Sequence, residues 1–431
     1  MNFRERANRV IPGGAHTYSK GNDQFPANAP DAFVRGKGAR VWDLDGREFV
    51  DWGMGINNVL IGHAEDAIDD AASAAARNGQ NFSRPTVLEV EAAEELVALL
   101  DGMEMAKFAK NGSDANTAAI RLARAVTGRE LVFYDGTAPF LAIHDWFIGN
   151  TEMRAGVPDA VSRLAKRFVY DDTASLDRLF ETHGADAAAV ILEPCRDRRP
   201  SPGFLEHLRR LCDRHGALLI YDEVVTGFRL STNGTSRLFG VTPDLMSVGK
   251  ALANGYALTA LAGRREFMQR GGLDHDAERV FLLSTTNGAE QSALAAGRAT
   301  MAFYRDHDVI GHLERAGNQV RAVLESAARP LGIGEHLFVG GDFAARPTLV
   351  CLDHERKPSA AFRTLFHQEM IRRGVFMPWI CPSFRHGPDE LERTAAAFGS
   401  AAGVYARAVE ARSTDRWLEG PAVKPVFRRY N

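Results

Sequence analysis

The sequence lacks the features of several large classes of protein. Its 431 residues contain only four cysteines, and no two of them have CxxC or metal-ligand spacing (Cys195, Cys212, Cys351, Cys381). This argues against a disulfide framework or a zinc site and favours a reducing compartment. No run approaches roughly eighteen uninterrupted apolar residues, and the opening MNFRERANRVIPGG has no apolar stretch suited to a signal peptide. We therefore expect a soluble cytoplasmic protein with no membrane partner.

An excess of charge of one sign is also missing. The 52 Lys and Arg residues are balanced by 55 Asp and Glu residues, for a net charge of -3. Such a chain has no bulk electrostatic attraction for nucleic acid or for an anionic membrane. Its 45% hydrophobic and 25% charged residues are typical of a folded globular protein. The composition thus gives no sign of a nucleic-acid partner, and we predict no metal site.

What the chain does contain is an alternation of helical and strand patterns. Short apolar runs at 106–110, 130–134, 187–194 and 217–223 alternate with helical patterns at 86–100, 115–126 and 203–216. Strands that are apolar throughout and separated by helices are typical of a parallel sheet covered on both faces. We predict an α/β fold, with a large domain built on a mostly parallel sheet of the seven-stranded type and a smaller α+β domain.

Both ends of the chain have a different pattern. Residues 39–52 alternate around Asp45-Gly46, which predicts a hairpin with Val41 and Leu44 on one arm. After residue 305 come long helical patterns at 310–332 and 389–412, with strand patterns at 348–354 and 374–379. We predict an N-terminal segment, 1–60, that packs with the small domain, a large domain at 61–305, and a small domain at 306–431.

Polar stretches follow the predicted strands, where ligands of open α/β sheets gather. YDEVVTGFRL places Asp222 and Glu223 at the end of one strand, and KNGSDA at 110–115 forms a turn that opens a helix and can bind an anion. SVGKALANG places Lys250 among small residues, which favours loss of its charge and Schiff-base chemistry. STTNGAE at 284–290 is a further hydroxyl-rich turn.

Each stretch alone has an ordinary structural explanation. Strands commonly end on charged residues, any helix can begin with an Asn-Gly-Ser turn, and most lysines are solvated at the surface. Phe140, in the loop TAPFLAIHDW, could stack on an aromatic ring or belong to the core. Lys250 does not belong to a P-loop, because Asp244 and Ala251 stand where that motif needs Gly and Ser or Thr.

The order of these stretches is more specific than any one of them. The series NGSD, an aromatic loop, EP, DEVxTGFR, SxGKALANG and STTxG resembles the class III (fold type I) pyridoxal-phosphate-dependent aminotransferases, over nearly the whole chain. Within that class it is most similar to the glutamate-1-semialdehyde aminomutase branch. The stretches GGAHTYSKG, DWGMG and VFMPW and the tail GPAVKPVFRRYN also resemble the carbohydrate-modifying members, including those of aminoglycoside biosynthesis.

The resemblance implies a role for each motif residue. Lys250 corresponds to the lysine that forms a Schiff base with pyridoxal 5'-phosphate and moves the proton between Cα and C4′, and Asp222 to the partner of the pyridine nitrogen. The other implied cofactor residues hold the phosphate (Asn111, Gly112, Ser113), flank the ring (Val224, Phe140), or lie beside it (Glu193). Thr285 would reach the cofactor of the neighbouring subunit, which implies a homodimer.

Three departures from the aminomutase pattern concern the substrate. Aligned on Pro12-Gly13-Gly14, the chain has Lys20 where the aminomutase has a carboxylate-binding arginine, and lysine cannot form a bidentate fork. Pro378 and Trp379 stand where its gating loop would be. CRDRRP replaces the turn whose amide binds the cofactor's phenolic oxygen, so that Arg196 or Arg198 substitutes or the contact is lost.

From these departures we predict a transaminase of an oxidised sugar or cyclitol with an amino acid donor, plausibly glutamate. His16, Tyr18, Lys20 and Trp379 would bind the hydroxylated ring, although His16 could equally be a satisfied loop histidine. Other readings stay open: a true glutamate-1-semialdehyde 2,1-aminomutase, an epimerase or isomerase of an amino sugar, a transaminase of ω-amino acids or amines, and a cofactor-free binding protein that kept the fold.

Overall fold

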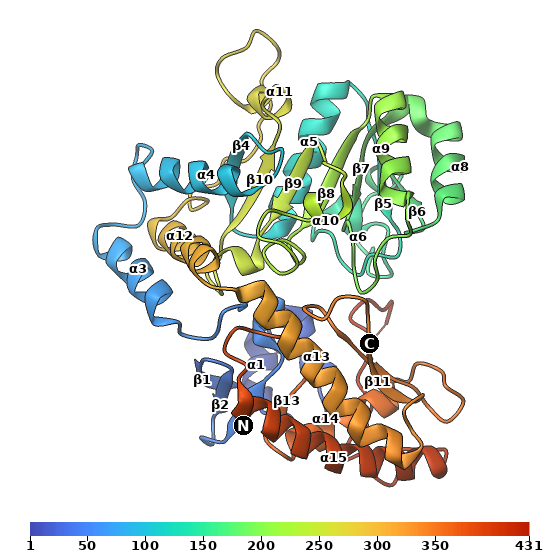
Figure 1. Ribbon diagram of the computed structural model, residues 1–431. Coiled ribbons are helices and arrows are strands. Elements are labelled where there is room, and N and C mark those ends of the chain that lie inside the picture. The colour runs from blue at the N-terminus through green and yellow to red at the C-terminus, as the bar shows by residue number, and fades with distance from the viewer. Residues whose placement is uncertain (431) are drawn as a thin grey trace. The chain divides into compact units, whose positions relative to one another are not determined.

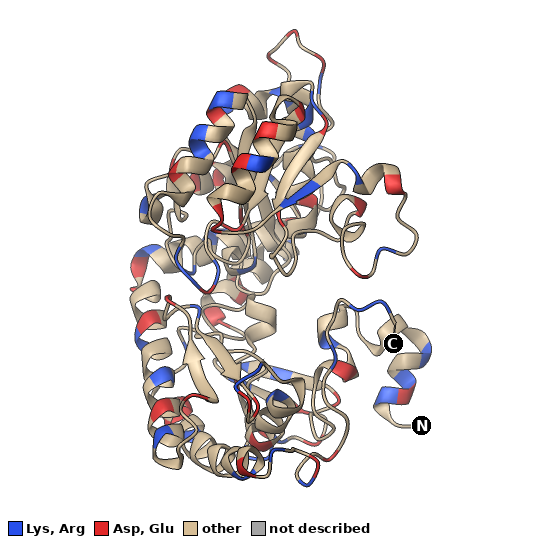
Figure 2. Ribbon diagram, turned by 90° about the vertical axis from the view of Figure 1, so that its right-hand side faces the viewer, with Lys and Arg blue, Asp and Glu red and all other residues tan. Residues whose placement is uncertain are grey.

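The computed structural model describes residues 1–430, which divide into two compact units (Figure 1). Residues 66–310 form one unit, and residues 1–65 together with 311–430 form the other. Basic and acidic residues are interspersed along the helices of both units (Figure 2), as the near-zero net charge leads one to expect. Among residues 1–430, no helix is both long and apolar enough to cross a membrane, and no group of three or more His, Cys, Asp or Glu side chains could hold a metal ion.

The unit at 66–310 is built on a seven-stranded sheet of order β4-β10-β9-β8-β7-β5-β6. The neighbours from β9 to β6 pair in parallel, and β10 pairs antiparallel with both β9 and β4. The strands are β4 (Met105–Ala109), β5 (Leu131–Asp135), β6 (Ala165–Phe168), β7 (Ala187–Leu192), β8 (Leu218–Glu223), β9 (Leu245–Val248) and β10 (Thr259–Gly263). The predicted α/β fold with a mostly parallel sheet is confirmed.

Helices connect these strands: α3 (Asp66–Arg77), α4 (Val87–Leu99), α5 (Gly112–Thr127), α6 (Asp145–Ile148), α7 (Asp159–Ser162), α8 (Thr173–His183), α9 (Phe204–His215), α10 (Ser236–Phe239), α11 (Arg265–Met268) and α12 (Gln291–Asp306). The sequence specifies their ends locally. Asn111 caps α5 by accepting from the Asp114 N–H at 3.0 Å, and Gly216 ends α9 with a left-handed φ of 66°.

The two faces of β8 are covered by different helices. Leu219 and Tyr221 pack in a core cluster with Phe204 and Leu208 of α9. Because side chains alternate along a strand, Asp222 points to the opposite face, where the side chain of Asn116 on α5 donates to it. Helices therefore cover both faces of the sheet, and the last residues of β8 place side chains on each face.

Some elements differ from the sequence prediction. The strands β6, β9 and β10 were not predicted, because they have only four or five residues each and no alternating pattern. Leu44 was predicted on a hairpin arm but lies exposed in the turn, since β2 ends at Asp43, whose carboxylate accepts from the Asp45 and Arg47 N–H groups. STTNGAE does not follow a strand; it precedes α12.

The other unit contains a sheet of order β1-β2-β3-β13 and a separate pair, β11-β12. Its elements are α1 (Phe3–Val10), β1 (Phe33–Lys37), β2 (Arg40–Asp43), β3 (Glu48–Asp51), α2 (Met54–Asn57), nearly all of α13 (Val309–Ala328), β11 (Leu337–Gly340), β12 (Thr348–Cys351), α14 (Ala360–Ile371), β13 (Val375–Phe376) and α15 (Pro388–Glu410). Trp52, Phe366, Phe398 and Tyr405 lie in its core. Three short 3₁₀ turns, at Pro12–Gly14, Tyr18–Lys20 and Asn22–Gln24, follow α1.

Candidate active site

The centre of the candidate site is the carboxylate of Asp222, the fifth residue of β8. Its side chain is only 6% exposed. One oxygen accepts from the Val224 N–H at 3.0 Å and the other from the Asn116 amide at 2.7 Å. Burial and the nearby Glu193 carboxylate nevertheless raise the pKa of Asp222 to about 6. This carboxylate would be stabilised by a cation placed beside it.

The beginning of α5 lies next to this carboxylate. A Cβ atom built on Gly112 would come within 2.8 Å of the Val224 side chain, so that only glycine lets the helix approach this closely. Ser113 is buried, and its hydroxyl oxygen accepts from the Ile143 N–H at 3.0 Å. The structure thus brings together the predicted phosphate residues, Val224 and Asp222. N–H groups at the start of a helix are suited to binding an anion, although that of Asp114 is already bonded to the Asn111 side chain.

Asn116 joins three elements and was not predicted as a site residue. Its amide nitrogen donates to Asp222 and, at 2.7 Å, to the Leu141 carbonyl, which ties the loop of Phe140 to α5. Its amide oxygen is buried and, among residues 1–430, has no hydrogen-bond partner. No signal in the sequence indicates this role, because the burial of Asn116 and the partner that faces it depend on how α5 packs against β8.

Phe140 itself is 44% exposed and makes an edge-to-face contact with Phe147 at 6.0 Å between ring centroids. The loop therefore holds this ring beside the start of α5 with one side uncovered. A partly exposed aromatic ring at a polar site is available to stack on a planar ligand.

Lys250 follows the end of β9, directly beside β8 in the sheet. Its backbone has a left-handed φ of 45°, which is strained for a residue other than glycine. The preceding Gly249 lies against Thr259, where a Cβ would come within 2.8 Å of the hydroxyl oxygen. The positive charge of Lys250 lowers the pKa of Asp222, although less than burial raises it, so the two side chains are electrostatically coupled.

The ends of β7 and β5 complete this edge of the sheet. Glu193 directly follows β7, is buried, and is the charged group that raises the pKa of Asp222 most. The guanidinium of Arg196 donates to the Thr137 carbonyl at 2.6 Å and contacts Asp135 at 3.4 Å, at the end of β5. Arg196, one of two predicted partners for the phenolic oxygen, is thus engaged by Asp135 and Thr137.

Thr285 lies apart from these residues, in the exposed turn before α12. With Ser284 and Leu283 it lines a groove of about 610 Å³ along α4 and β4. Val90 of α4 also lines this groove and is half exposed. No described contact joins Thr285 to Asp222 or Lys250 within the chain.

The predicted substrate residues belong to the other unit. His16, Tyr18 and Lys20 lie exposed on the short turns after α1, and the Tyr18 side chain is 55% exposed. Trp379 is half buried, and its indole nitrogen donates to the Gly53 carbonyl at 2.8 Å. The N-terminal residues are thus available to a ligand, whereas the indole N–H of Trp379 is already engaged.

Gly53 introduces a strained turn that the sequence reasoning missed. The four residues of α2 all have positive φ, including Met54 at 40° and the β-branched Ile56 at 62°. A β-branched residue in this conformation is a genuine outlier, and such strain is concentrated at functional sites. No local pattern signals it, because Met and Ile favour ordinary helix or strand.

Comparisons with known proteins agree on one family. The family model described as aminotransferase class III matches residues 24–335. The chain is 34% identical over 412 residues to the 3-aminobutyryl-CoA aminotransferase of Cloacimonas acidaminovorans (strain Evry), covering 92% of this chain and 95% of the relative. It is also 34% identical over 420 residues to a glutamate-1-semialdehyde 2,1-aminomutase of Syntrophobacter fumaroxidans (strain DSM 10017 / MPOB), with the same coverage. The PLP-bound FumI protein of Sphingopyxis sp. MTA144 has a TM-score of 0.87 and 29% identity over 95% of this chain and 97% of that chain.

The residues present fit pyridoxal phosphate. Asp222 is a buried carboxylate whose raised pKa a cationic pyridine nitrogen would offset, and Lys250 is coupled to it. The start of α5 offers N–H donors at a place where Gly112 leaves no room for a Cβ. All of the predicted cofactor residues lie within the matched range, whereas His16, Tyr18, Lys20 and Trp379 lie outside it.

The raised pKa of Asp222 predicts how stability changes with pH. In the cofactor-free protein, the folded state keeps a proton on Asp222 up to about pH 6, while the unfolded carboxyl loses it near its ordinary pKa of 3.8. The unfolded state therefore binds fewer protons between these values, and stability falls as pH rises. Relative to Asp222→Asn, the parent should lose about 1–2 kcal/mol of unfolding free energy between pH 5 and pH 8. Urea denaturation at both pH values measures this difference.

Saturation with pyridoxal phosphate provides the matched comparison. A cationic nitrogen beside Asp222 lowers its pKa, so the pH-dependent difference from Asp222→Asn should disappear. An equal difference with and without the cofactor would contradict this placement of the carboxylate.

We also expect Asn116→Ala to weaken cofactor binding about tenfold, because Asp222 and Leu141 both lose a buried donor. Release of the cofactor followed by visible absorbance checks this. Thr127→Val, at the other end of α5, removes a hydroxyl bonded only to the backbone of Ala123 and Arg129 and serves as the control. Equal affinities in the two variants would show that Asn116 does not support the site.

Proposed function

The chain belongs to the class III aminotransferases, a family of enzymes that use pyridoxal phosphate, and from this premise we propose which substrates it uses. It transfers an amino group from an amino acid, such as glutamate, to the carbonyl of an oxidised sugar or cyclitol. The observation that carries the proposal is Lys20. This side chain lies exposed on its turn and makes no ion pair within residues 1–430. A lysine is a compact point charge and cannot grip a carboxylate in two places as arginine does.

The neighbours of Lys20 suit a hydroxylated ring. His16 and Tyr18 expose an imidazole and a phenol that can donate to and accept from hydroxyl groups. Trp379 is half buried against Met54 and Val59, and we propose that the exposed part of its ring packs on the apolar side of a sugar ring. These residues lie outside the range 24–335 that the family model matches, so the proposed substrate contacts are separate from the matched cofactor residues.

The cofactor residues have separate roles in this reaction. When bound, pyridoxal phosphate supplies an electron sink for the Cα–H bond of the amino substrate. Lys250 removes the proton from Cα of the donor and returns a proton on the acceptor side. Asp222 keeps the pyridine nitrogen protonated. Asn111, Gly112 and Ser113 hold the phosphate, and Val224 and Phe140 flank the ring. Donor and acceptor use the same site in turn, so ping-pong kinetics are expected.

A glutamate-1-semialdehyde 2,1-aminomutase is the second candidate, because a protein of that name is 34% identical to the chain along nearly its whole length. The 3-aminobutyryl-CoA aminotransferase has the same identity, so similarity alone does not choose between substrates. An internal amino shift or an epimerisation of an amino sugar would use the same proton transfer by Lys250. Lys20 distinguishes the first two candidates, since the aminomutase substrate carries a carboxylate that an arginine fork would hold, whereas the ring of an oxidised sugar or cyclitol acceptor needs hydroxyl partners instead.

The proposed active enzyme is a homodimer. Thr285 is exposed and lines a groove with half-exposed apolar residues of α4, which a second copy would cover. In this arrangement, the Thr285 hydroxyl reaches the phosphate held by α5 of the partner subunit. Each site is then incomplete in a single chain.

The first experiment follows the visible spectrum of the purified enzyme during separate additions of glutamate, glutamate-1-semialdehyde and the amino sugar neamine. We expect glutamate and neamine to bleach the absorbance of the bound cofactor, because each donates its amine, and the semialdehyde to have little effect. Lys20→Arg is the matched variant and should shift the response toward the semialdehyde, since it restores the bidentate fork. Rapid turnover of the semialdehyde by the parent would instead favour the aminomutase function.

Replacement of the lysine tests the assigned chemistry. Lys250→Ala should keep noncovalently bound cofactor but lose about a thousandfold or more in transamination rate, whereas Lys166→Ala on β6 should leave the rate unchanged.

In hybrid dimers of Lys250→Ala and Thr285→Ala subunits, one site keeps both intact residues if Thr285 acts across the interface, and activity should recover. Parent-like turnover by Lys250→Ala would refute its role, and hybrids as slow as Thr285→Ala alone would place Thr285 in its own subunit's site.

A further inference from the structure

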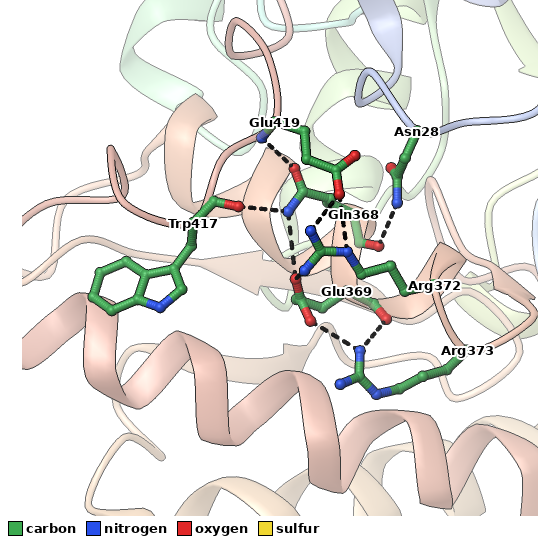
Figure 3. Close-up of polar contacts among 7 residues, drawn as sticks. All are labelled: Asn28, Gln368, Glu369, Arg372, Arg373, Trp417 and Glu419. Carbon is green, nitrogen blue, oxygen red and sulfur yellow. Dashed lines mark hydrogen bonds and ion pairs between the residues drawn. The ribbon is translucent and has the colours of Figure 1, made fainter.

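The C-terminal segment, residues 411–430, returns along α14 and is fixed there by Gln368. This side chain is almost fully buried. Its amide nitrogen donates to the Trp417 carbonyl at 2.7 Å, and its amide oxygen accepts from the Glu419 N–H at 2.9 Å (Figure 3). Its backbone carbonyl accepts from the side chain of Asn28 at 3.0 Å. One glutamine therefore holds the C-terminal segment and the N-terminal segment together.

Ion pairs strengthen the same junction. Glu369, whose side chain is buried, binds both Arg372 and Arg373. Arg372 also reaches Glu419 of the C-terminal segment, as Figure 3 shows. A buried carboxylate shared by two arginines is costly to disrupt, because losing one partner leaves its charge uncompensated. The C-terminal segment thus starts from a fixed point on α14.

Beyond Glu419 the C-terminal segment contacts the N-terminal turns directly. The Val423 N–H donates to the Thr364 hydroxyl and the Lys424 N–H to the Asp23 carbonyl, both at 2.9 Å. The guanidinium of Arg428 pairs with the Asp23 carboxylate at 2.5 Å. Asp23 is therefore held through both its backbone and its side chain.

Asp23 lies one short turn away from Lys20. The Gly21 N–H donates to the Tyr18 carbonyl at 2.9 Å, and the Gln24 N–H donates to the Gly21 carbonyl at 3.0 Å. A Cβ on Gly21 would come within 2.9 Å of an Asp23 carboxylate oxygen, so the two turns are packed against each other. A shift of Asp23 therefore moves the turn that carries Tyr18 and Lys20.

We propose that the C-terminal segment positions the substrate-binding turn at residues 16–20 through the ion pair of Arg428 with Asp23 and the hydrogen bond from the Lys424 N–H to the Asp23 carbonyl. The inference rests on the proposed function, in which His16, Tyr18 and Lys20 bind the substrate. Arg428 acts through Asp23 and touches neither cofactor nor substrate, so it is a positioning residue. Its loss raises KM for the carbohydrate substrate and leaves kcat unchanged, because the residues around Asp222 and Lys250 belong to the other unit.

Two readouts test this with the full-length holoenzyme. Arg428→Gln is compared with Arg429→Gln, which removes an equally basic but exposed neighbour. Trypsin cleavage after Lys20, followed by mass spectrometry, reports the order of the turn without any substrate. We expect cleavage about fivefold faster, and KM for neamine about fivefold higher at unchanged kcat, in Arg428→Gln only.

A chain lacking residues 420–431 should show the larger effect on both readouts, and Asp23→Asn combined with Arg428→Gln should be no worse than either alone. Unchanged cleavage in Arg428→Gln overturns the positioning role. Faster cleavage with unchanged KM overturns the link to substrate binding. Failure of neamine to react with the parent counts against the proposed function instead, and the cleavage result still decides whether the C-terminal segment orders the turn.

Discussion

The candidate site depends on a carboxylate held where solvent cannot reach it. Asp222 accepts two hydrogen bonds, from Val224 and Asn116, yet burial and Glu193 still raise its pKa to about 6. A buried acid in this state favours a cation as its neighbour. Lys250 is one such charge, and in the proposed enzyme the pyridine nitrogen of the cofactor would be the other. Cofactor binding would therefore favour the ionised carboxylate of Asp222 together with a protonated pyridine nitrogen.

The pair Asp222-Glu223 illustrates how one strand supports both function and fold. Glu223 is buried as well, but it points away from Asp222 and accepts from the Thr235 N–H and hydroxyl, at 2.8 to 3.0 Å. These bonds fix the loop after β8, although burial still raises the pKa of Glu223 to about 7. Two adjacent carboxylates are tolerated because alternation along the strand sends them to opposite faces. Asp222 serves the candidate site and Glu223 the loop.

The sequence was sufficient to predict the fold class and to place Asp222, Lys250 and the start of α5 at one edge of a sheet, because strand ends and helix starts leave local signals. It could not identify Asn116, whose importance depends on what faces it across the sheet. It also could not reveal the left-handed turn at Met54–Asn57, where the surrounding structure overrides local preference. The contacts of Arg428 with Asp23 join the two ends of the chain, and no periodic pattern connects residues so distant.

The division of the chain gives a physical reason why one family can contain enzymes of different substrates. The predicted cofactor residues all belong to the unit at 66–310, whereas His16, Tyr18, Lys20 and Trp379 belong to the other unit and lie outside the matched range. A change in the second group therefore leaves the buried carboxylate and its partners untouched. The turns that carry His16, Tyr18 and Lys20 still need support from elsewhere in the chain, since short 3₁₀ turns have few internal hydrogen bonds to fix them. In this chain the C-terminal segment supplies that support, so substrate preference can depend on residues far from any reacting atom.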